Sequence, residues 1–294
     1  MHVAVLGAGT MGHGIAQVSA MAGHEVRLRD IEAERVDAGI EGIESNLDGG
    51  VERDKVTPEE RANALDRIEG TTDLAAAVSD ADVVVEAVPE RPDLKKDVLG
   101  EAESFAPADA TLASNTSSLS VTDLGSALED PTRFCGLHFF NPVHIMPLVE
   151  VVIAERTDEA TRESAVEFVE GVGKTPIVVR DAPGFASSRL GVALGAEAMR
   201  MLESGVASAA DIDAAMELGY NHPMGPLELT DMVGLDVRLD VLEYLREELG
   251  ERFRPPQVLK RKVRAGKLGK KTGEGFYVWE DGENVGVSGE GGAA

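Results

Sequence analysis

The sequence predicts an α/β protein in which a doubly wound parallel sheet is followed by a smaller all-α domain. Over residues 2–180, short apolar runs typical of buried strands alternate with helical segments. A glycine-rich turn joins the first strand to the first helix. Beyond residue 184 the pattern is helical, apart from one apolar run at residues 275–279. We therefore expect a sheet domain at residues 1–184, a helical domain at 185–280 and a disordered acidic tail at 281–294.

The N-terminal strand and its turn form a dinucleotide-binding pattern. Residues 2–6 run into GAGTMG, a helix follows, and a second strand ends in Asp30. The G-x-G-x-x-G turn becomes specific in this strand–helix–acid context, which predicts a Rossmann-type domain. Asp30 would accept hydrogen bonds from ribose hydroxyls and repel a 2′-phosphate, so NAD is expected rather than NADP. The contacts expected here are Gly7, Gly9, Thr10, Met11, Gly12 and Asp30.

Two helical segments interrupt the alternation after Asp30. Residues 32–47 and 58–68 have helical spacing, and TPEE at residues 57–60 is an N-cap signature. They predict a helical hairpin inserted between the second and third strands. The remaining strands are expected near residue 68, at 81–89, at 111–114, around His138, at 148–154 and at 175–180, with helices at 92–105 and 159–172. The expected helices of the second domain cover residues 187–203, 209–218, 227–231 and 237–249.

Four polar residues gather near the later strands of the sheet. Ser117 follows one strand, and His138 lies at the tip of the next. Asn141 and a proline break the run, and the chain returns in a hairpin-like path to Glu150. A carboxylate close to an imidazole is what a general base needs, because it fixes the tautomer and stabilises the imidazolium. Taken alone, the same residues also fit an ordinary polar turn and a surface or core histidine.

Composition limits the class of protein. Hydrophobic residues make up 43% of the 294 residues, and no run of 18 apolar residues could span a bilayer. The first residues enter a strand directly, so no signal peptide is expected. The single cysteine, Cys135, excludes an internal disulfide and fits a reducing compartment. We expect a cytoplasmic protein without a bound metal.

The net charge of −25 is extreme and excludes nucleic acid and anionic membranes as partners. It is typical of proteins from salt-adapted microbes, and an ordinary acidic enzyme is the alternative. Residues 252–271 depart from this pattern, with nine Lys and Arg and no acid. They predict a basic helix docked on the acidic body, attraction for an anionic, phosphate-rich ligand, or both together. GKLGKKTG within this run is not a Walker loop, because the order of residues is wrong and no strand precedes it.

Seven motifs give the chain a resemblance to the L-3-hydroxyacyl-CoA dehydrogenase family, bacterial 3-hydroxybutyryl-CoA dehydrogenases included. In order they are GAGTMGHGIA, EAVPE, SNTSSL, GLHFFNPVHIMPLVEV, PGFASSRL, HPMGPLELTDMVGLD and GKKTGEGFY, and they cover nearly the whole chain. The resemblance implies an NAD enzyme of β-oxidation or related fatty acid metabolism that interconverts (S)-3-hydroxyacyl-CoA and 3-ketoacyl-CoA. It also implies a homodimer formed through the helical domain.

The resemblance assigns roles to individual residues. His138 matches the catalytic base and Glu150 its orienting carboxylate, while Ser117 and Asn141 match residues that hold the reacting oxygen. The positions expected near NAD are Glu90, Lys95 and Lys271. The nearest matches to the CoA-binding positions are Asn46 with Arg53 or Lys55, and Ser188 stands where the family usually has an asparagine.

Two other classes remain open at this point. A hydrolase could use Ser117, His138 and Glu150 as a triad, but no G-x-S-x-G elbow surrounds the serine. A non-catalytic NAD-binding protein of the same fold is the second alternative, since fold alone does not establish activity.

Overall fold

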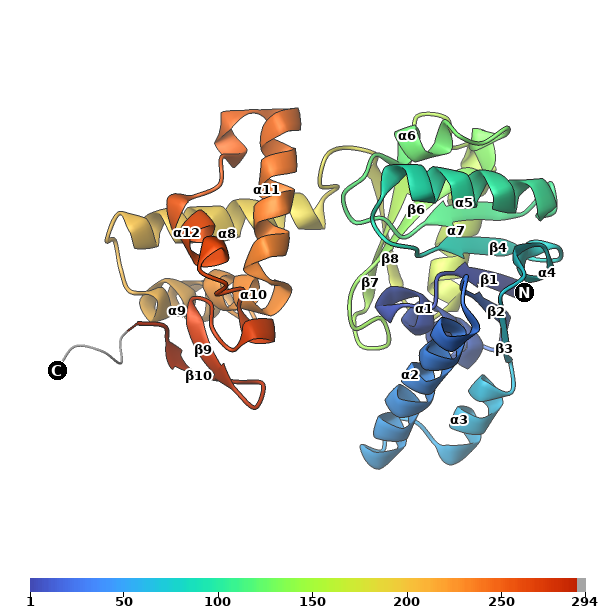
Figure 1. Cartoon of the computed structure of the whole chain (residues 1–294), viewed down its shortest axis with the longest axis horizontal. Coiled ribbons are helices and arrows are strands. Elements are labelled where there is room, and N and C mark those ends of the chain that lie inside the picture. The colour runs from blue at the N-terminus through green and yellow to red at the C-terminus, as the bar shows by residue number, and fades with distance from the viewer. Residues whose placement is uncertain (290–294) are drawn as a thin grey trace. The chain divides into compact units, whose positions relative to one another are not determined.

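A computed structural model describes residues 1–289 of the chain. It divides into two compact units, Met1–Phe185 and a second that begins at Ala186 (Figure 1). The division falls one residue beyond the expected boundary at residue 184. Within the described residues, no helix is both long enough and apolar enough to cross a membrane.

An eight-stranded sheet forms the centre of the first unit, in the order β3-β2-β1-β4-β5-β6-β7-β8. The first six of these strands are parallel, as predicted for a doubly wound sheet. The last two strands depart from the parallel pattern. β7 pairs antiparallel with β6, in keeping with the hairpin-like return expected between His138 and Glu150, and β8 then follows β7 in parallel. The strands are β1 (His2–Leu6), β2 (Glu25–Arg29), β3 (Ile68–Thr71), β4 (Val83–Glu86), β5 (Thr111–Ser114), β6 (Phe134–Phe139), β7 (Leu148–Ile153) and β8 (Thr175–Arg180).

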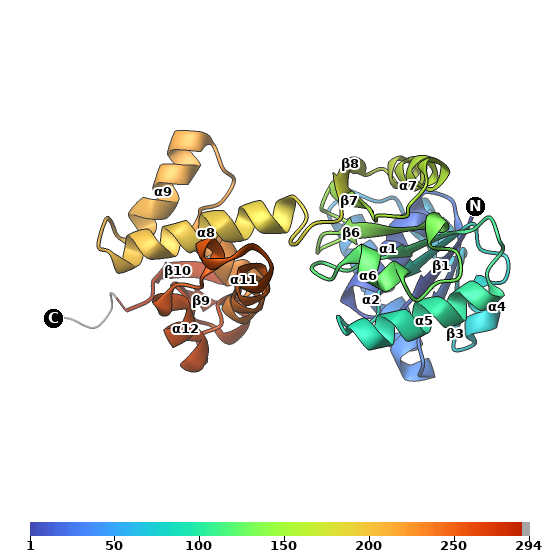
Figure 2. The ribbon, with the colours of Figure 1, turned by 90° about the horizontal axis from the view of Figure 1, so that it is seen from above.

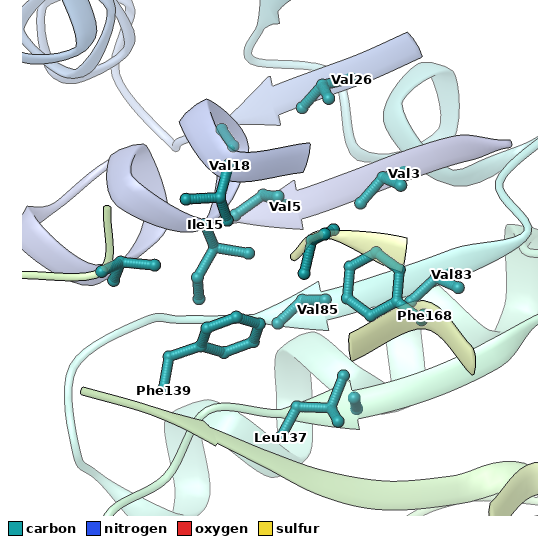
Figure 3. Packing of buried hydrophobic residues seen from close by; sticks show 14 of the residues in the cluster. Val3, Val5, Ile15, Val18, Val26, Val83, Val85, Leu137, Phe139 and Phe168 are labelled. Carbon is teal, nitrogen blue, oxygen red and sulfur yellow. The ribbon is translucent and has the colours of Figure 1, made fainter. Parts of the chain in front are cut away.

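Helices cover both faces of this sheet. Alternate strand residues point to opposite faces, so Val3 and Val5 pack against one helical layer while Ala4 and Leu6 pack against the other. Figure 3 shows Val3, Val5 and Phe168 in the first of these cores. Helices α1 (Thr10–Met21) and α7 (Glu159–Gly171) lie on that face, and α4 (Leu74–Val78), α5 (Pro92–Phe105) and α6 (Val121–Gly125) lie on the other. Figure 2 shows α7 and α5 on opposite sides of the sheet.

The inserted helical hairpin is present between β2 and β3. It consists of α2 (Ala33–Glu52) and α3 (Pro58–Leu65), so α2 runs five residues beyond its predicted end at residue 47. Thr57 and Glu60 form the expected capping box at the start of α3. The short helices α4 and α6 were not predicted from the sequence.

The second unit is mainly helical, as predicted, but it also contains an antiparallel hairpin. Its helices are α8 (Ser187–Glu203), α9 (Ala209–Tyr220), α10 (Pro226–Val233), α11 (Leu235–Leu249) and α12 (Gln257–Arg264). Strands β9 (Tyr277–Glu280) and β10 (Glu283–Val287) pair through a two-residue turn. The expected disordered tail is therefore wrong for residues 281–289, and its remainder, 290–294, lies outside the described residues.

Local chemistry explains this hairpin. Asp281 and Gly282 both have positive φ, 47° and 83°, as a tight two-residue hairpin turn of the Asp-Gly kind requires. The buried carboxylate of Asp231 accepts hydrogen bonds from the amides of Phe276 and Tyr277 at 2.8 and 2.9 Å. The hairpin is thereby tied to α10, which carries Asp231.

Four of the nine cations in the basic run at residues 252–271 pair with acids in the described part of the second unit. Lys260 lies 3.1 Å from Glu243, and Lys271 lies 2.6 Å from Asp236. Lys262 donates to the carbonyl of Gly275 at 2.6 Å. These contacts support the docked basic helix, which is α12 and its flanks, while attraction for an anionic ligand stays a prediction.

Candidate active site

The antiparallel pairing of β6 and β7 brings His138 opposite Glu150. The His138 Nδ1 atom lies 2.7 Å from Glu150 Oε2, and the Glu150 carboxylate is completely buried. Because an ionised carboxylate can only accept, Nδ1 carries the hydrogen and Nε2 carries the lone pair. The hairpin-like return expected from the sequence thus produces an oriented imidazole that can accept a proton at Nε2.

Neighbouring residues hold the imidazole in place. The ring of Phe140 lies 4.5 Å from the His138 ring and that of Phe185 lies 5.8 Å away, measured between centroids. Asn115 Oδ1 accepts a hydrogen bond from the amide of Phe139 at 2.9 Å, which ties the end of β5 to β6. Asn115 was missed in the sequence analysis, although it stands within the SNTSSL motif.

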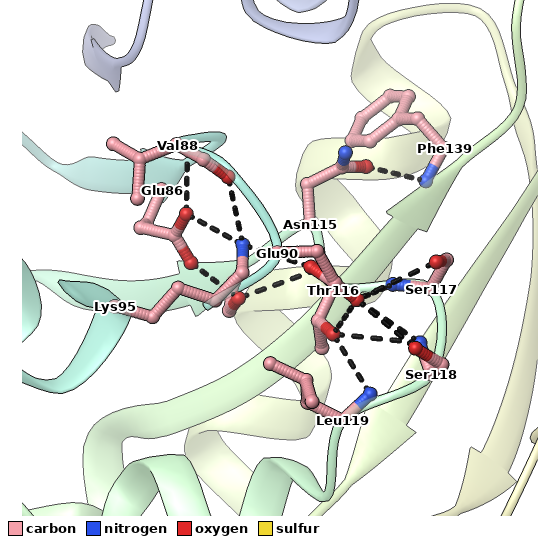
Figure 4. Close-up of polar contacts among 11 residues, drawn as sticks. Glu86, Val88, Glu90, Lys95, Asn115, Thr116, Ser117, Ser118, Leu119 and Phe139 are labelled. Atoms are coloured by element: carbon pink, nitrogen blue, oxygen red, sulfur yellow. Dashed lines mark hydrogen bonds and ion pairs between the residues drawn. The ribbon is translucent and has the colours of Figure 1, made fainter. Parts of the chain in front are cut away.

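The loop that carries Ser117 is organised by Glu90 (Figure 4). Glu90 Oε1 accepts hydrogen bonds from the Thr116 hydroxyl at 2.5 Å and from the amides of Ser117 and Ser118 at 2.9 and 3.2 Å. The Ser117 side chain is exposed, and its hydroxyl is 3.4 Å from the same oxygen. Glu90 therefore supports the serine loop from beneath.

The glycine-rich turn lies at the carboxyl end of β1, where parallel sheets bind their ligands. Gly7 has a φ of +110°, and a Cβ on Gly12 would lie 1.7 Å from the carbonyl oxygen of Gly7. A Cβ on Gly9 would meet nothing within 4 Å. Gly7 and Gly12 are thus required by the protein's own backbone, whereas Gly9 leaves open space for a ligand.

A pocket of about 530 Å³ adjoins this turn. Asp30 lines it, and its Oδ2 accepts a hydrogen bond from the amide of Ala8 at 2.8 Å. Arg35 on α2 also lines the pocket and pairs with Glu32 at 3.0 Å. The sequence analysis missed Arg35, because nothing in its local pattern distinguishes it from a solvated helix residue. The predicted cofactor contacts that line the pocket are Gly7, Gly9, Thr10, Met11 and Asp30.

A second pocket, of about 240 Å³, connects the turn to the loop after β6. Thr10, Asn46 and Asn141 line it together with two histidines not assigned a role from the sequence, His13 and His144. Burial lowers the pKa of both histidines below the usual range. The predicted oxygen-holding residue Asn141 and the predicted CoA residue Asn46 therefore border one pocket.

The other CoA candidates lie further along the helical hairpin. Arg53 borders a separate pocket, and Lys55 is exposed in the link between α2 and α3. Acidic residues dominate that pocket, Glu41, Glu44, Asp48 and Glu52 among them. The roles of Arg53 and Lys55 stay predictions.

Two predicted residues belong to the second unit. Ser188 lies in the first turn of α8, and Lys271 pairs with Asp236 at 2.6 Å. Their roles toward substrate and NAD also stay predictions. In the described residues, 1–289, no group of three or more His, Cys, Asp and Glu side chains could hold a metal ion.

Comparison with known proteins agrees with this geometry. The profile of the 3-hydroxyacyl-CoA dehydrogenase NAD-binding domain matches residues 2–182, and that of the same family's C-terminal domain matches residues 184–279. A 3-hydroxybutyryl-CoA dehydrogenase of Bradyrhizobium diazoefficiens is 42% identical over 287 residues, covering 96% of this chain and 97% of that protein. The mitochondrial hydroxyacyl-coenzyme A dehydrogenase of Sus scrofa is 42% identical over 286 residues, covering 95% and 91%. The crystal structure of (S)-3-hydroxybutyryl-CoA dehydrogenase from Ralstonia eutropha superimposes with a TM-score of 0.91 at 40% identity, covering 95% of this chain and 99% of that one.

Proposed function

Because the chain belongs to the 3-hydroxyacyl-CoA dehydrogenase family, we propose that it oxidises (S)-3-hydroxyacyl-CoA reversibly to 3-ketoacyl-CoA with NAD. The observation that carries the proposal is the buried His138–Glu150 pair in the same unit as the glycine-rich turn. The glycine-rich turn would hold the dinucleotide, and the His138–Glu150 pair would move the proton. The names of the relatives support the substrate class.

The residues at the turn fit a dinucleotide. The open space over Gly9 admits a pyrophosphate, and the amides at the start of α1 can bind it. Asp30 lines the same pocket, and its carboxylate would accept hydrogen bonds from the adenosine ribose hydroxyls. When bound, NAD supplies the nicotinamide ring that accepts a hydride from C3 of the substrate.

The proton and the oxygen are handled by the chain itself. His138 Nε2 takes the proton of the 3-hydroxyl group, and Glu150 stabilises the resulting imidazolium through Nδ1. Ser117 and Asn141 hold the substrate oxygen as it loses its proton. Such donors help only if they are held in position beforehand, and the hydrogen bonds of Glu90 to the serine loop serve this purpose.

The alternatives receive less support. A serine triad needs the serine hydroxyl on the histidine, whereas the Ser117 hydroxyl lies 3.4 Å from the carboxylate of Glu90. A non-catalytic NAD-binding protein would have no use for a buried histidine–carboxylate pair. A single assay distinguishes both alternatives from the proposed dehydrogenase.

The test is a spectrophotometric NADH assay with (S)-3-hydroxyacyl-CoAs of graded chain length, run at low and at molar salt. We expect NAD reduction with at least one chain length and none with the (R)-enantiomer. NAD binding without turnover under all these conditions would favour the non-catalytic protein. Inactivation by a serine-directed acylating probe, together with NAD-independent hydrolysis, would favour the hydrolase.

We also infer a homodimer formed through the second unit. Four of its large apolar side chains are strongly exposed: Leu190 (71%), Val206 (62%), Leu218 (87%) and Tyr220 (76%). Exposed apolar residues in such numbers are typical of association surfaces. Light scattering after size exclusion should give twice the chain mass of 31.1 kDa. A monomer at micromolar concentration would contradict this inference.

We further infer a cytoplasmic protein, which its single cysteine fits, and one that works in high salt, which its net charge of −25 supports. Repulsion among the acids destabilises the compact state, and salt screens it. We expect the melting temperature to rise steeply between low and molar KCl. A melting temperature independent of salt would favour the ordinary acidic enzyme, and cell fractionation would test the compartment.

A further inference from the structure

Arg238 on α11 is a buried arginine without a counter-ion. The residue is 8% exposed, and its Nε atom is buried without a hydrogen-bond partner. Burial lowers the pKa of Arg238 to about 10, and within residues 1–289 no charged neighbour offsets that effect. A buried charge without a partner is costly, because it has lost its water and no anion takes the place of that water. The guanidinium therefore has donors available for an anion that the described residues do not supply.

The guanidinium lies beside the start of α8. A Cβ on Gly191 would lie 3.3 Å from Arg238 Nη1, so the glycine leaves room for the guanidinium. Gly191 follows Ser188 by three residues on α8, which places the two on the same side of the helix, about 4.5 Å apart along its axis. Ser188 is the position that the family resemblance places toward the substrate. The unpaired cation is thus within about one helical turn of that position.

The chemistry of the proposed substrate limits what the missing anion can be. The long pantetheine arm separates the phosphates of CoA from the carbon that reacts. With Ser188 at the reacting end of the substrate, an anion one turn away belongs to the acyl chain and not to CoA. The anion that an acyl chain can carry at its far end is a carboxylate, which a guanidinium binds through two parallel hydrogen bonds.

We propose that Arg238 is a specificity-determining residue, which favours acyl-CoA substrates whose acyl chain ends in a carboxylate. The inference rests on the proposed function and on the substrate-side place of Ser188. A terminal carboxylate would neutralise the buried guanidinium. A terminal methyl group would leave the charge unpaired, so the same residue disfavours neutral chains.

The decisive comparison uses two substrates of equal length, (S)-3-hydroxyadipoyl-CoA and (S)-3-hydroxyhexanoyl-CoA, which differ in a terminal carboxylate or methyl group. At constant ionic strength, kcat/KM of the unmutated protein should be about tenfold to a hundredfold higher for the acidic chain, the value of a hydrogen bond to a charged group. Turnover of the neutral chain with an equal or higher kcat/KM would overturn the proposal and leave the proposed function standing.

Arg238→Met should bring the ratio of the two kcat/KM values close to one. Arg246→Met is the matched control, because Arg246 lies on the same helix and pairs with the exposed Glu251 at 2.6 Å. It should keep the ratio of the unmutated protein. Arg238→Lys keeps the charge but not the planar fork, so it should keep only part of the preference. A preference for the acidic chain that survives in Arg238→Met would overturn the proposal.

Thermal unfolding separates this role from a purely structural one. Replacing a buried charge by an apolar side chain of similar size is often neutral or stabilising. Arg238→Met should therefore melt at or above the temperature of the unmutated protein. A lower melting temperature, with kcat/KM reduced equally for both substrates, would make Arg238 a structural residue and would overturn the proposal. Should Arg238→Met fail to fold, the substrate ratio of Arg238→Lys decides in its place.

A carboxylate from a second copy of the chain is the other anion to consider, given the homodimer inferred above. Dissociation of the dimer in Arg238→Met with an unchanged substrate ratio would assign the residue to the interface and overturn the proposal. If the unmutated protein oxidises neither substrate, the proposed function fails. Titration calorimetry with the two acyl-CoAs still tests Arg238 in that case. Tighter binding of the acidic chain that Arg238→Met abolishes supports the proposal, and equal binding overturns it.

Discussion

Asp30 and Ala8 are joined by a hydrogen bond of 2.8 Å from the Ala8 amide to Asp30 Oδ2. The acid at the end of β2 is thereby fixed against the glycine-rich turn. Asp30 Oδ1 accepts from the amide of Ile31, also at 2.8 Å. Each carboxylate oxygen keeps a second acceptor site, which can bind a ribose hydroxyl.

The first prediction follows from this fixed carboxylate. The unmutated protein should use NAD with a much higher kcat/KM than NADP, because a 2′-phosphate would lie against Asp30. Asp30→Asn should lower the ratio of the two kcat/KM values at least about tenfold, since repulsion between like charges costs several kcal/mol. Neighbouring Arg29 donates to the carbonyl of Thr72 at 3.3 Å, so it should not rescue NADP. Equal kcat/KM for the two cofactors in the unmutated protein would refute the assignment.

The second prediction uses Gly9 and Gly12 as a matched pair. Gly9→Ala should fold with an unchanged melting temperature, because the new methyl group meets no protein atom within 4 Å. It should still weaken NAD binding by crowding the phosphates. Gly12→Ala places a methyl group against the carbonyl of Gly7 and should lower the melting temperature by several degrees, about 2–4 °C for each kcal/mol lost. Calorimetry and NAD titration check both, and normal NAD affinity in Gly9→Ala would show that the cofactor does not approach the turn there.

The third prediction concerns the base. His138→Gln should reduce kcat about a hundredfold to ten-thousandfold, the usual contribution of a general base. NAD affinity should remain near normal, because the imidazole acts on the hydroxyl group. His2→Gln, a change at a half-exposed histidine on β1, serves as the control. A His138→Gln variant that keeps more than about a tenth of the rate would exclude histidine as the base.

The fourth prediction concerns Cys135, which is fully buried on β6. Burial raises the pKa of its thiol to about 12. Alkylating reagents attack the thiolate, whose fraction at pH 8 is then about one in ten thousand. The native protein should resist iodoacetamide at pH 8, and unfolding in guanidinium should release one reactive thiol. Rapid alkylation without loss of structure would contradict the burial.

The fifth prediction concerns Ser188, where the family usually has an asparagine. A serine hydroxyl is shorter than an asparagine amide and would reach substrate only through a bridging water. Ser188→Ala should therefore cost about 1 kcal/mol in kcat/KM. Loss of turnover as complete as in His138→Gln would place Ser188 among the primary catalytic groups.

The parts of the fold that were predicted correctly are those whose sequence signal is local. Residues 83–86 are all buried, and they appear in the sequence as a continuous β-branched run. The glycine-rich turn is recognisable in the sequence because the backbone requires glycine at two of its positions. A side chain on Gly7 or Gly12 would clash with backbone atoms of the protein itself. The hairpin-like return to Glu150 was expected because Asn141 and Pro142 interrupt an apolar run. The register of β6 and β7 then places Glu150 opposite His138.

Some features were missed because they depend on contacts between residues far apart in the sequence. Another was missed because a turn signal lies within a segment whose composition is typical of disorder. The strand β10 lies in a Gly- and acid-rich segment, yet its Asp281-Gly282 turn is a strong hairpin signal that was overlooked. The burial of Lys95 beside Glu86 was not expected, because lysine is seldom buried and no local pattern indicates this partner. The expected role of Lys95 toward NAD stays a prediction. Asn115 bonds to an amide 24 residues away, which no local pattern reveals.

The antiparallel pairing of β6 and β7 has a consequence for how this enzyme can diverge. The His138–Glu150 pair anchors the two strands, so both ends of the segment between them, residues 140–147, are fixed by the sheet. That segment contributes Asn141 and His144 to the smaller pocket. Substitutions there can reshape what the pocket admits while the proton-accepting nitrogen keeps its place. With the roles proposed above, substrate range and proton chemistry would be encoded in separable stretches of one hairpin, and descendants of this chain could acquire new substrates without rebuilding the base.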